Sequence, residues 1–375
     1  MLFNLLYSFI LTLCAPLFFL YWLAQSIKHR VPLKRMLERF GYIPNLPKRA
    51  LWIHAASIGE LKVANMIKPY IEHLGPIIIS SSTCRGPTTS QTDFFLPYDH
   101  PICVKKVLKQ LNPKALILIE TEIWPSLIKH ADCPVFLLNA RLSEKSHKKY
   151  LRIKPLIQHA FKKLKGTWCS SEFDAKRLED LGANITSIHP NIKYLNAKKP
   201  QSLNENRDAI VFSCTHPGEE SMLIPVFDKI ISKRHDQKLV LIPRHGHRKQ
   251  SLEKLLSKFK KNLHIEDRFG YTHHWYERAK TVFIGGSFIC HGGQNPIEPL
   301  THGCTTIIGP HYHNFKLVTE NLLAQNLIHL VQEPGELSDM CLNSYPQPSP
   351  WAFFDAQKSI IQESLKQLVD RLSRL

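Results

Sequence analysis

The first half of the chain alternates between short apolar runs and longer amphipathic stretches. Apolar runs lie at residues 51–54, 76–80, 115–119 and 134–138, with two more at 166–170 and 185–188. Amphipathic stretches near 59–74, 101–111 and 122–131 separate the first four runs. Short and continuously apolar strands are typical of parallel sheets, because such sheets are buried on both faces. The pattern therefore predicts an α/β fold in which helices cover a parallel sheet.

The alternation breaks at residues 190–207, which are polar, contain Pro and Asn, and include few large apolar side chains. Such a composition is typical of a linker. Apolar runs resume at 209–213, 238–242, 281–284 and 305–309. The sequence thus predicts two Rossmann-like domains facing a cleft. The expected segments are an N-terminal helix at 1–27, a first domain at 28–190, a linker at 191–207, a second domain at 208–352, and a C-terminal helix at 353–375 that packs back toward the first domain.

Residues 2–24 are almost entirely apolar, and a helix of this length is long enough to cross a bilayer. No Lys or Arg precedes this run, whereas five follow it, at Lys28, Arg30, Lys34, Arg35 and Arg39. The positive-inside rule then places the rest of the chain in the cytoplasm. A cleaved signal peptide is disfavoured, because the basic start and the small-residue cleavage site are missing. We predict an uncleaved membrane anchor, and a helix lying in the interface stays an alternative to a spanning one.

The net charge of the chain indicates what kind of partner the protein binds. The chain has 49 Lys and Arg against 31 Asp and Glu, a net charge of +18. Such an excess indicates an anionic partner. Because the basic residues are scattered instead of gathered in long arms, an anionic membrane surface or a phosphorylated substrate is favoured over nucleic acid. The nine cysteines are dispersed without a C-x-x-C pair, which is typical of a reducing compartment.

The clearest chemical signal is the stretch G-G-S-F-I-C-H-G-G-Q-N-P-I-E-P at residues 285–299, directly after a predicted strand. Its glycines allow sharp turns and close approach of a ligand to the backbone. Asn295 is a candidate N-cap, with Pro296 at the first helical position. A strand, a Gly-rich loop and a helix N-terminus form an anion site, and Glu298 has the chemistry to accept ribose hydrogen bonds. The alternative is a plain strand-to-helix turn, but the combination favours a nucleotide site.

Other polar motifs also follow predicted strands, at the edge where ligands bind in open α/β sheets. These motifs are H-A-A-S-I-G-E (54–60), E-T-E-I-W-P (120–125), N-A-R-L-S-E (139–144), S-C-T-H-P-G-E-E (213–220) and P-R-H (243–245). Each has a purely structural alternative: Ser57 suits a helix cap, and Glu60 suits a first-turn residue favoured by the helix dipole. Together, however, they crowd one edge of two sheets, which structure alone does not require.

Several nucleotide and metal classes are disfavoured. The chain has neither a G-x-G-x-x-G fingerprint after a strand nor a P-loop, which argues against dinucleotide oxidoreductases and P-loop NTPases. It also lacks an Asp-x-Asp pair that would hold Mg²⁺ on a diphosphate. H-x-H occurs at His245/His247 and at His311/His313. A zinc site there is disfavoured, because pairs arise by chance among 20 histidines.

The motifs and their order along the chain resemble those of the 3-deoxy-D-manno-oct-2-ulosonic acid (Kdo) transferases of lipopolysaccharide assembly. The resemblance runs from about Arg39 to Phe315 and includes R-F-G (39–41), W-I-H-A-A-S-I-G-E, L-P-Y-D (96–99), E-T-E-I-W-P, N-I-K (191–193), T-H-P-G-E-E, the stretch at 285–299, and G-P-H-Y-H-N-F (309–315). It implies a membrane-anchored glycosyltransferase of GT-B fold in the bacterial inner membrane, with cytoplasmic domains. The implied donor is CMP-Kdo and the implied acceptor a lipid A precursor (lipid IVA), with inversion at the sugar and neither metal nor cofactor.

The resemblance also implies residue roles. Glu60 corresponds to the general base, and Glu122 and Lys193 lie in motifs near the reaction centre. The segments that hold the CMP-Kdo donor include Thr215, Arg244, His245, Gly286, Ser287, Gly292, Gly293, Asn295 and Glu298.

Three places depart from the family pattern. Gln294 stands where His is common, R-H-G-H-R (244–248) replaces R-H-P-E-R, and S-T-C-R-G (82–86) replaces a Thr-rich stretch. The first two concern the donor half and the third the acceptor side. Two alternatives stay open at this point: a GT-B transferase that uses a UDP-sugar, and a membrane-tethered GT-B binding protein without turnover.

Overall fold

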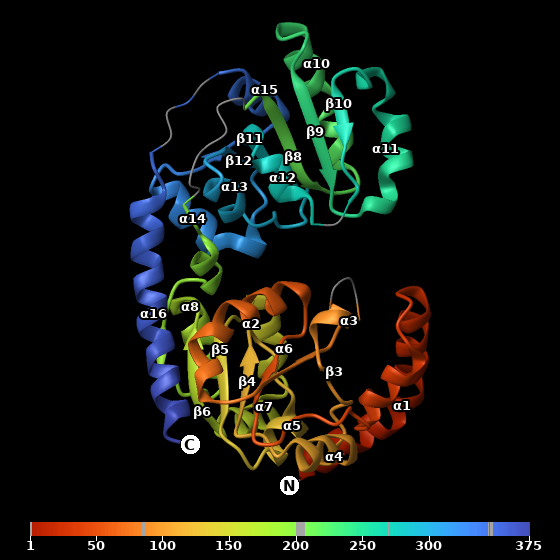
Figure 1. Ribbon diagram of the computed structural model, residues 1–375, viewed down its shortest axis with the longest axis vertical. Coiled ribbons are helices and arrows are strands. Elements are labelled where there is room, and N and C mark those ends of the chain that lie inside the picture. Colours follow the sequence, from red (N-terminus) through yellow and green to blue (C-terminus); the bar gives the residue numbers. More distant parts are fainter. Residues whose placement is uncertain (1, 85–87, 200–206, 269, 344, 346–347) are drawn as a thin grey trace. The chain divides into compact units, whose positions relative to one another are not determined.

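The computed structural model describes residues 2–84, 88–199, 207–268, 270–343, 345 and 348–375. The chain divides into two compact units (Figure 1). Unit 1 comprises Met1–Leu195 with Gln357–Leu375, and unit 2 comprises Asn196–Ala356. Each is an α/β unit built on one parallel sheet, and each is described by itself.

Unit 1 has a seven-stranded sheet in the order β3-β2-β1-β4-β5-β6-β7, with every pairing parallel. The strands are β1 (Leu51–His54), β2 (Ile77–Ser81), β3 (Phe94–Phe95), β4 (Ala115–Ile119), β5 (Val135–Ala140), β6 (Leu164–Cys169) and β7 (Ser187–Ile188). From β1 the chain builds outward to β3, then returns to the middle and builds outward on the other side from β4. The direction of winding therefore reverses between β1 and β4, as in doubly wound folds.

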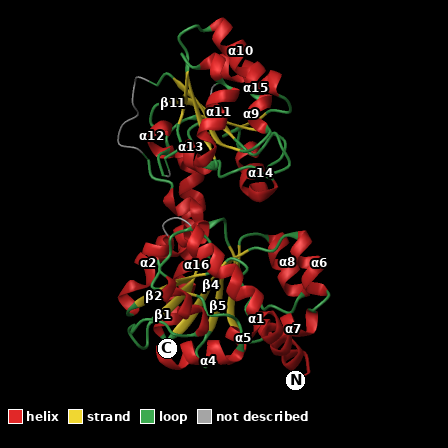
Figure 2. Cartoon of the chain, turned by 90° about the vertical axis from the view of Figure 1, so that its right-hand side faces the viewer, coloured by secondary structure: helices red, strands yellow, loops and turns green. Residues whose placement is uncertain are grey.

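Helices cover both faces of this sheet, as the turned view shows (Figure 2). They are α2 (Ile58–Ile71), α3 (Thr88–Gln91), α4 (Pro101–Leu111), α5 (Pro125–His130), α6 (Glu144–Leu151), α7 (Lys154–Phe161) and α8 (Glu172–Asp180), with the 3-10 turns η1 (Leu33–Phe40), η2 (Glu72–Leu74) and η3 (Ile192–Asn196). The apolar faces of strands and helices form one core, in which Trp52, Leu116 and Leu137 are buried. This burial is what holds such short strands in place.

The apolar N-terminal run forms one helix, α1 (Leu2–Lys28), as predicted. It is the one helix in the described chain that is long and apolar enough to cross a membrane. One of its faces packs on unit 1: the Tyr7 hydroxyl donates to Asp99 (2.8 Å), and the Tyr98 hydroxyl donates to the Leu11 carbonyl (2.7 Å). Farther along, Trp22 packs edge-on against Tyr98. The helix is therefore also a structural part of this unit.

Unit 2 has a six-stranded parallel sheet in the order β10-β9-β8-β11-β12-β13. The strands are β8 (Ala209–Thr215), β9 (Lys238–Pro243), β10 (Leu263–Ile265), β11 (Ala279–Ile284), β12 (Thr305–Ile308) and β13 (His329–Leu330). Here the reversal of winding lies between β8 and β11. The helices are α9 (Glu219–Met222), α10 (Ile224–Lys233), α11 (Lys249–Leu255), α12 (Thr272–Tyr276), α13 (Ile297–Thr301), α14 (Lys316–Ala324) and α15 (Pro334–Leu342), with the turns η4 (Gly246–Arg248), η5 (Ser257–Phe259) and η6 (His313–Phe315).

Two predicted segments differ in detail. The expected linker opens with η3, whose Ile192 and Tyr194 are buried, so its first residues belong to the packed part of unit 1. Residues 200–206 of that segment lie outside the described residues. The C-terminal helix α16 (Trp351–Ser373) joins unit 1 from Gln357 onward. There the Arg371 guanidinium lies over the Trp168 ring, 5.4 Å from its centroid.

Candidate functional site

Both units place polar motifs at the point where their winding reverses. In unit 1 the turns after β1 and β4 carry S-I-G-E and E-T-E, and in unit 2 the turns after β8 and β11 carry H-P-G-E-E and G-G-S. Ligands of open α/β sheets bind at this reversal, beyond the carboxyl ends of the strands. Three non-glycine residues at strand ends have left-handed backbones: Glu120 (φ 59°), Asn139 (φ 55°) and Cys214 (φ 58°). Backbone conformations that are rare for such residues cluster at functional sites.

Glu60 occupies the first turn of α2 in unit 1. One carboxylate oxygen accepts from the Ala56 N–H (2.6 Å), and the other accepts from the Ser57 hydroxyl (2.9 Å). Ser57 in turn caps the helix, because its hydroxyl oxygen accepts from the Glu60 N–H (3.3 Å). This is a variant of the capping box in which Glu60 accepts from the Ala56 N–H instead of the Ser57 N–H, so the structural alternative for Ser57 and Glu60 is realised. The capping bonds also fix the position of the Glu60 carboxylate.

The electrostatic surroundings of Glu60 go beyond capping. Burial raises the pKa of its carboxyl, and the nearby carboxylates of Glu120 and Glu122 raise it further, to about 8. The two hydrogen bonds from Ala56 and Ser57 only partly offset this rise. A carboxylate with a raised pKa is a stronger base, and such groups cluster at catalytic sites.

Glu122 and Lys193 come from separate elements to the same region as Glu60. A Glu122 carboxylate oxygen lies 3.8 Å from Nε2 of the fully buried His54. The ammonium nitrogen of Lys193, on η3, lies 4.0 Å from the position that a Cβ would take on Gly59, next to Glu60. The structure thus brings the three predicted catalytic residues into one neighbourhood of unit 1.

In unit 2 the Gly-rich loop is already occupied by a carboxylate of the chain itself. The fully buried Glu219, on α9, accepts four backbone N–H groups. The donors are His216 (3.2 Å), Gly286 (2.6 Å), Ser287 (3.0 Å) and Phe288 (3.1 Å). The strand, glycine loop and amides do make an anion site, as predicted, but the anion at this point is Glu219. The amides of Gly286 and Ser287 therefore donate to Glu219, and a role of these two residues in donor binding stays a prediction.

A cluster of cationic and imidazole groups lies beside this nest. The ring of His216 stacks on that of His291, with centroids 3.6 Å apart, and the ring of His245 meets it edge-on at 6.0 Å. Burial lowers the pKa of His216 to about 4, and His291, His245, Arg244 and Arg248 add to this effect. Positive charges this close together repel one another, so a bound anion would reduce the repulsion within the cluster. Arg248 is fixed by two contacts to buried Glu220, at 2.6 and 3.1 Å.

Other predicted donor residues surround the same loop. Gly286, Gly292 and Gly293 have left-handed backbones, and a Cβ on Gly292 would lie 2.5 Å from the His313 ring. Thr215 is buried at the end of β8, where its carbonyl accepts from the Arg244 N–H (2.9 Å). The positions that were expected to bind donor are thus gathered at the carboxyl end of this sheet.

The helix after the loop begins later than predicted. Pro296, not Asn295, is the N-cap of α13, although the Asn295 side chain does accept from the Ile297 N–H (3.2 Å). Glu298 is half-buried. Its charge adds to the rise that burial causes in the pKa of Tyr276, and partly offsets the fall that burial causes in the pKa of His302.

The sequence patterns overlooked several of these residues. Glu219, His216 and His54 lie in recognised motifs, but their roles depend on contacts between distant turns. Within the described residues no group of three or more His, Cys, Asp or Glu side chains is arranged to hold a metal ion.

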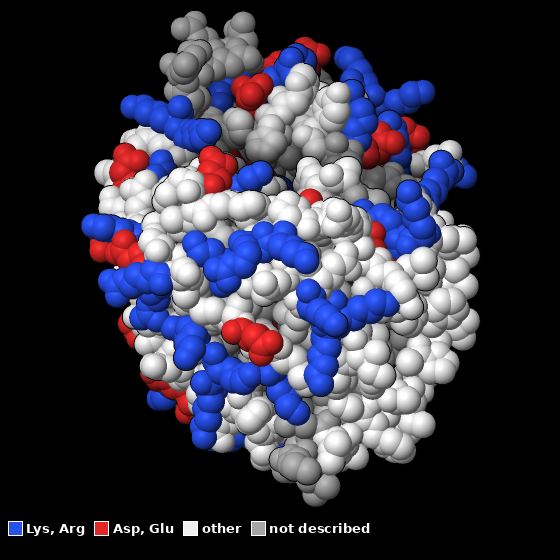
Figure 3. Space-filling model, turned by 60° about the horizontal axis from the view of Figure 1, so that its bottom comes forward, with Lys and Arg blue, Asp and Glu red and all other residues white. Residues whose placement is uncertain are grey.

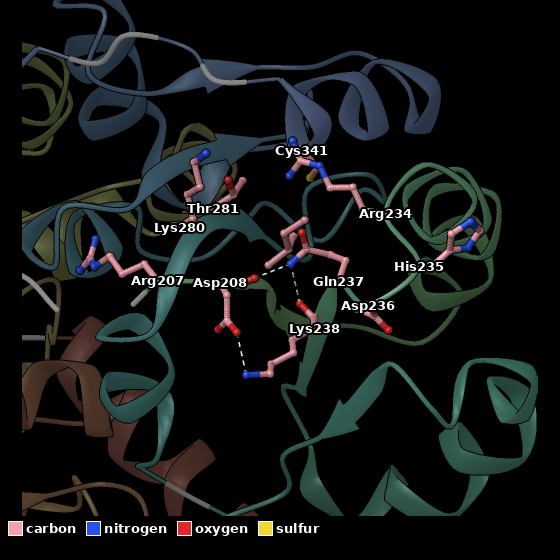
Figure 4. A pocket seen from close by; sticks show the side chains of 11 residues that line it. Arg207, Asp208, Arg234, His235, Asp236, Gln237, Lys238, Lys280, Thr281 and Cys341 are labelled. Carbon is pink, nitrogen blue, oxygen red and sulfur yellow. Dashed lines mark hydrogen bonds and ion pairs between the residues drawn. The ribbon is translucent and has the colours of Figure 1, made fainter. Parts of the chain in front are cut away.

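A cavity of about 500 Å³ in unit 2 lies elsewhere, at the amino ends of the strands (Figure 4). Several of its charges are paired internally: Lys238 with Asp208 (2.6 Å), while Arg207 and Arg234 donate to backbone carbonyls. Its position at the opposite edge from the motifs separates it from the candidate site.

Comparison with known proteins agrees with this arrangement. Residues 34–196 match the family model of 3-deoxy-D-manno-octulosonic-acid transferase (kdotransferase). The chain is 30% identical to the 3-deoxy-D-manno-octulosonic acid transferase of Aquifex aeolicus, over 77% of this chain and 84% of that protein. It is 29% identical to that of Haemophilus influenzae, over 82% of each.

Solved structures show the fold. The UDP-GlcNAc 2-epimerase of Neisseria meningitidis superimposes with a TM-score of 0.55 at 12% identity, covering 84% of this chain and 99% of that one. A glycosyltransferase from Rickettsia africae superimposes with a TM-score of 0.51 at 14% identity, covering 88% and 93%. The two Rossmann-like units therefore form a GT-B fold, and the chain belongs to the 3-deoxy-D-manno-octulosonic acid transferase family of glycosyltransferases.

Proposed function

We propose that this protein transfers Kdo from CMP-Kdo to a sugar hydroxyl of a lipid A precursor (lipid IVA), with inversion and without a metal. The observation that carries the proposal is Glu60, a carboxylate with a raised pKa at the reversal point of unit 1, beside Glu120 and Glu122. It is fixed by two hydrogen bonds and 8% exposed. Such a group is suited to take a proton from an attacking hydroxyl.

In the proposed step the acceptor hydroxyl attacks the anomeric carbon of Kdo. Its proton passes to the Glu60 carboxylate, the new bond forms between the hydroxyl oxygen and the anomeric carbon, and the bond from that carbon to the phosphate oxygen breaks. The electron pair of the broken bond leaves with CMP. One displacement of this kind inverts the anomeric centre.

Unit 2 supplies the proposed donor site. Charge grows on the CMP phosphate as it leaves, and the exposed Arg244, His245 and His291 surround His216. Positive groups aimed at a developing negative charge stabilise the transition state. Because Glu219 already uses the amides at Gly286–Phe288, we assign this stabilisation to the side chains. Glu298 is assigned to the ribose.

We propose an anionic membrane surface as the second partner. The outer face of α1 exposes large apolar side chains, including Leu13 (64%) and Leu17 (70%). The face of unit 1 that points down in Figure 1 carries many Lys and Arg and few acidic groups (Figure 3). In unit 1 Lys105, Lys129 and Lys163 lie close enough to His130 to add to the lowering of its pKa by burial. Apolar area next to basic groups binds anionic lipid. Residence at the bacterial inner membrane, with both units in the cytoplasm, belongs to this proposal.

The decisive experiment incubates the purified protein with CMP-Kdo and a tetraacylated lipid A precursor, and measures products by mass. We expect addition of Kdo that survives EDTA. Heat protection by CMP but not UDP would separate the proposal from a UDP-sugar transferase. Binding of CMP-Kdo without any product would support the non-catalytic binding protein instead.

A further inference from the structure

A chain of buried polar contacts runs behind the glutamates of unit 1 and is not used by the proposed reaction. The Trp52 indole N–H donates to the Ser80 hydroxyl oxygen (2.7 Å), and that hydroxyl lies 2.9 Å from Nδ1 of His54. Trp52, His54 and Ser80 are all fully buried. Parallel pairing of β1 with β2 places His54 directly beside Ser80, so the contact is fixed by the sheet register.

The donors and acceptors in this series of hydrogen bonds determine which ring nitrogen of His54 carries the proton. An indole N–H only donates, so Ser80 accepts from Trp52 and keeps one hydroxyl proton to give. Within the described contacts of Ser80, His54 Nδ1 is the group that can accept this proton. If Nδ1 carried a proton instead, the Ser80 hydroxyl proton would be buried without a partner, at a cost of about 1–3 kcal/mol. The neutral ring therefore holds its proton on Nε2.

The Nε2 proton faces the candidate site. Nε2 lies 3.2 Å from the Ser82 hydroxyl oxygen and 3.8 Å from a Glu122 carboxylate oxygen. Ser82 follows β2 and is tied down by buried Arg39, which donates to its carbonyl (2.5 Å). His54 thus links the ends of three neighbouring strands, β2, β1 and β4.

We propose that His54 is a positioning residue for the transfer reaction. Held as the Nε2–H tautomer by Trp52 and Ser80, it directs its N–H toward the Ser82 hydroxyl (3.2 Å). The same N–H dipole attracts the Glu122 carboxylate, at 3.8 Å and so without a hydrogen bond, and thereby keeps Glu122 near Glu60. The inference rests on the proposed function for its effect on rate, but the tautomer and the contact stand on geometry alone. The charged groups that meet there are Glu60, Glu120 and Glu122, with Lys193 near Gly59.

Two substitutions separate this role from simple packing. His54→Gln places an amide N–H near the position of Nε2, whereas His54→Asn reaches only the position of Nδ1. We expect kcat to fall by roughly 10- to 100-fold in His54→Asn, the size expected when a catalytic group is misplaced by about 1 Å. His54→Gln should stay within about threefold of wild type. Both should leave the KM for CMP-Kdo unchanged. Stability, measured separately, should fall more in His54→Gln, because Ser80 loses its acceptor there, so kcat and stability should change in opposite orders in the two variants.

A second measurement needs no turnover. A two-bond ¹H–¹⁵N correlation spectrum, with the His54 signals identified by their absence in His54→Asn, reports which ring nitrogen carries the proton. We expect Nε2–H in wild type and a mixture of tautomers in Ser80→Ala. A wild-type Nδ1–H tautomer, or equal loss of kcat in the two folded His54 variants, would overturn the proposal. If the wild-type protein made no product at all, the proposed function would fail while the spectrum still decided the tautomer.

Discussion

The first turn after the first strand of each unit ends in Gly-Glu, and the two glutamates behave differently. Glu60 follows β1 and Glu219 follows β8, each at the start of a helix. Glu219 is fully buried and accepts four backbone N–H groups. Glu60 accepts one backbone N–H and one hydroxyl, and has two carboxylates nearby.

This difference separates a structural carboxylate, Glu219, from the proposed base, Glu60. Burial raises the pKa of both glutamates. At Glu219 the four backbone N–H groups that donate to the carboxylate lower the pKa and partly offset this rise. At Glu60 the carboxylates of Glu120 and Glu122 push the pKa further up. The same residue at equivalent places therefore joins two turns in unit 2 and is the proposed base in unit 1. The partners of a carboxylate, not its place in the fold, decide which role it takes.

The largest expected effect is on the rate of Glu60→Gln. Glutamine keeps the size of the side chain. Its oxygen can accept from the Ala56 N–H and its amide can donate to the Ser57 hydroxyl oxygen, but it is not a base. The transfer rate should fall by roughly two to four orders of magnitude, the usual contribution of general-base catalysis. CMP affinity should stay close to wild type, as in the exposed control Glu72→Gln, and so should the melting temperature when it is measured below about pH 4.5. If the rate survived, the base would have to be sought at Glu122 or Glu120.

Glu219→Gln should have the opposite profile, a loss of stability. Its amide nitrogen would face backbone N–H groups that now donate to a carboxylate, which leaves buried donors unpaired. We expect a loss of about 3 kcal/mol or more in the free energy of unfolding, measured by chemical denaturation. CMP binding should weaken along with it, because the glycine loop loses its internal anchor. Unfolding indistinguishable from wild type would remove the structural role assigned to Glu219.

The dependence of rate on pH tests the raised pKa of Glu60. With a pKa of about 8 in the free protein, the base is mostly protonated at neutral pH. The value of kcat/KM should therefore rise by about tenfold per pH unit up to about pH 8 and then level off. A profile that is already flat above pH 6 would show that the neighbouring carboxylates do not act on Glu60.

The same shift predicts how stability depends on pH. Because the folded-state pKa lies above the ordinary value of 4.5, Glu60 stabilises the fold fully below about pH 4.5, and this contribution is lost as the pH rises through about 8. The free energy of unfolding of wild type, relative to Glu60→Gln, should fall across that window. A difference that does not change with pH would contradict this sign.

Much of the fold could be predicted from the sequence, because local pattern and burial agree there. The runs at 51–54 and 115–119 are β1 and β4 with the same bounds, and α4 matches 101–111. The pattern missed β3, β10 and β13, which have two or three residues and too little sequence for a period to show. Strand-end motifs also located both sites, since parallel strands gather their carboxyl ends at one edge.

The contacts within those sites could not be predicted. Glu219 meets the amides of Gly286–Phe288 because β8 and β11 are neighbours in the sheet, a pairing between strands some 70 residues apart in sequence. The link from His54 to Ser80 likewise depends on the register of β1 with β2. A single sequence also hides the packing of α1, whose Tyr7 reaches Asp99 across 92 positions. Local periodicity carries no information about such distances.

The smallest expected effect concerns Glu298 in unit 2. If Glu298 accepts the ribose hydroxyls of CMP, Glu298→Ala should weaken CMP binding by about 1 kcal/mol for each hydrogen bond lost, or roughly fivefold in Kd. Glu298→Gln keeps one acceptor oxygen, so its affinity for CMP should lie between those of wild type and Glu298→Ala. Calorimetric titration with CMP and with 2′-deoxy-CMP measures this directly, and the deoxy ligand, which keeps only the 3′-hydroxyl, should lose less affinity than CMP when Glu298 is replaced by Ala. Because unit 1 holds the proposed base, the Glu60→Gln protein should bind both ligands as wild type does. Unchanged CMP affinity in Glu298→Ala would leave the ribose to another residue, whereas equal weakening for both ligands would show that Glu298 acts through the fold of α13.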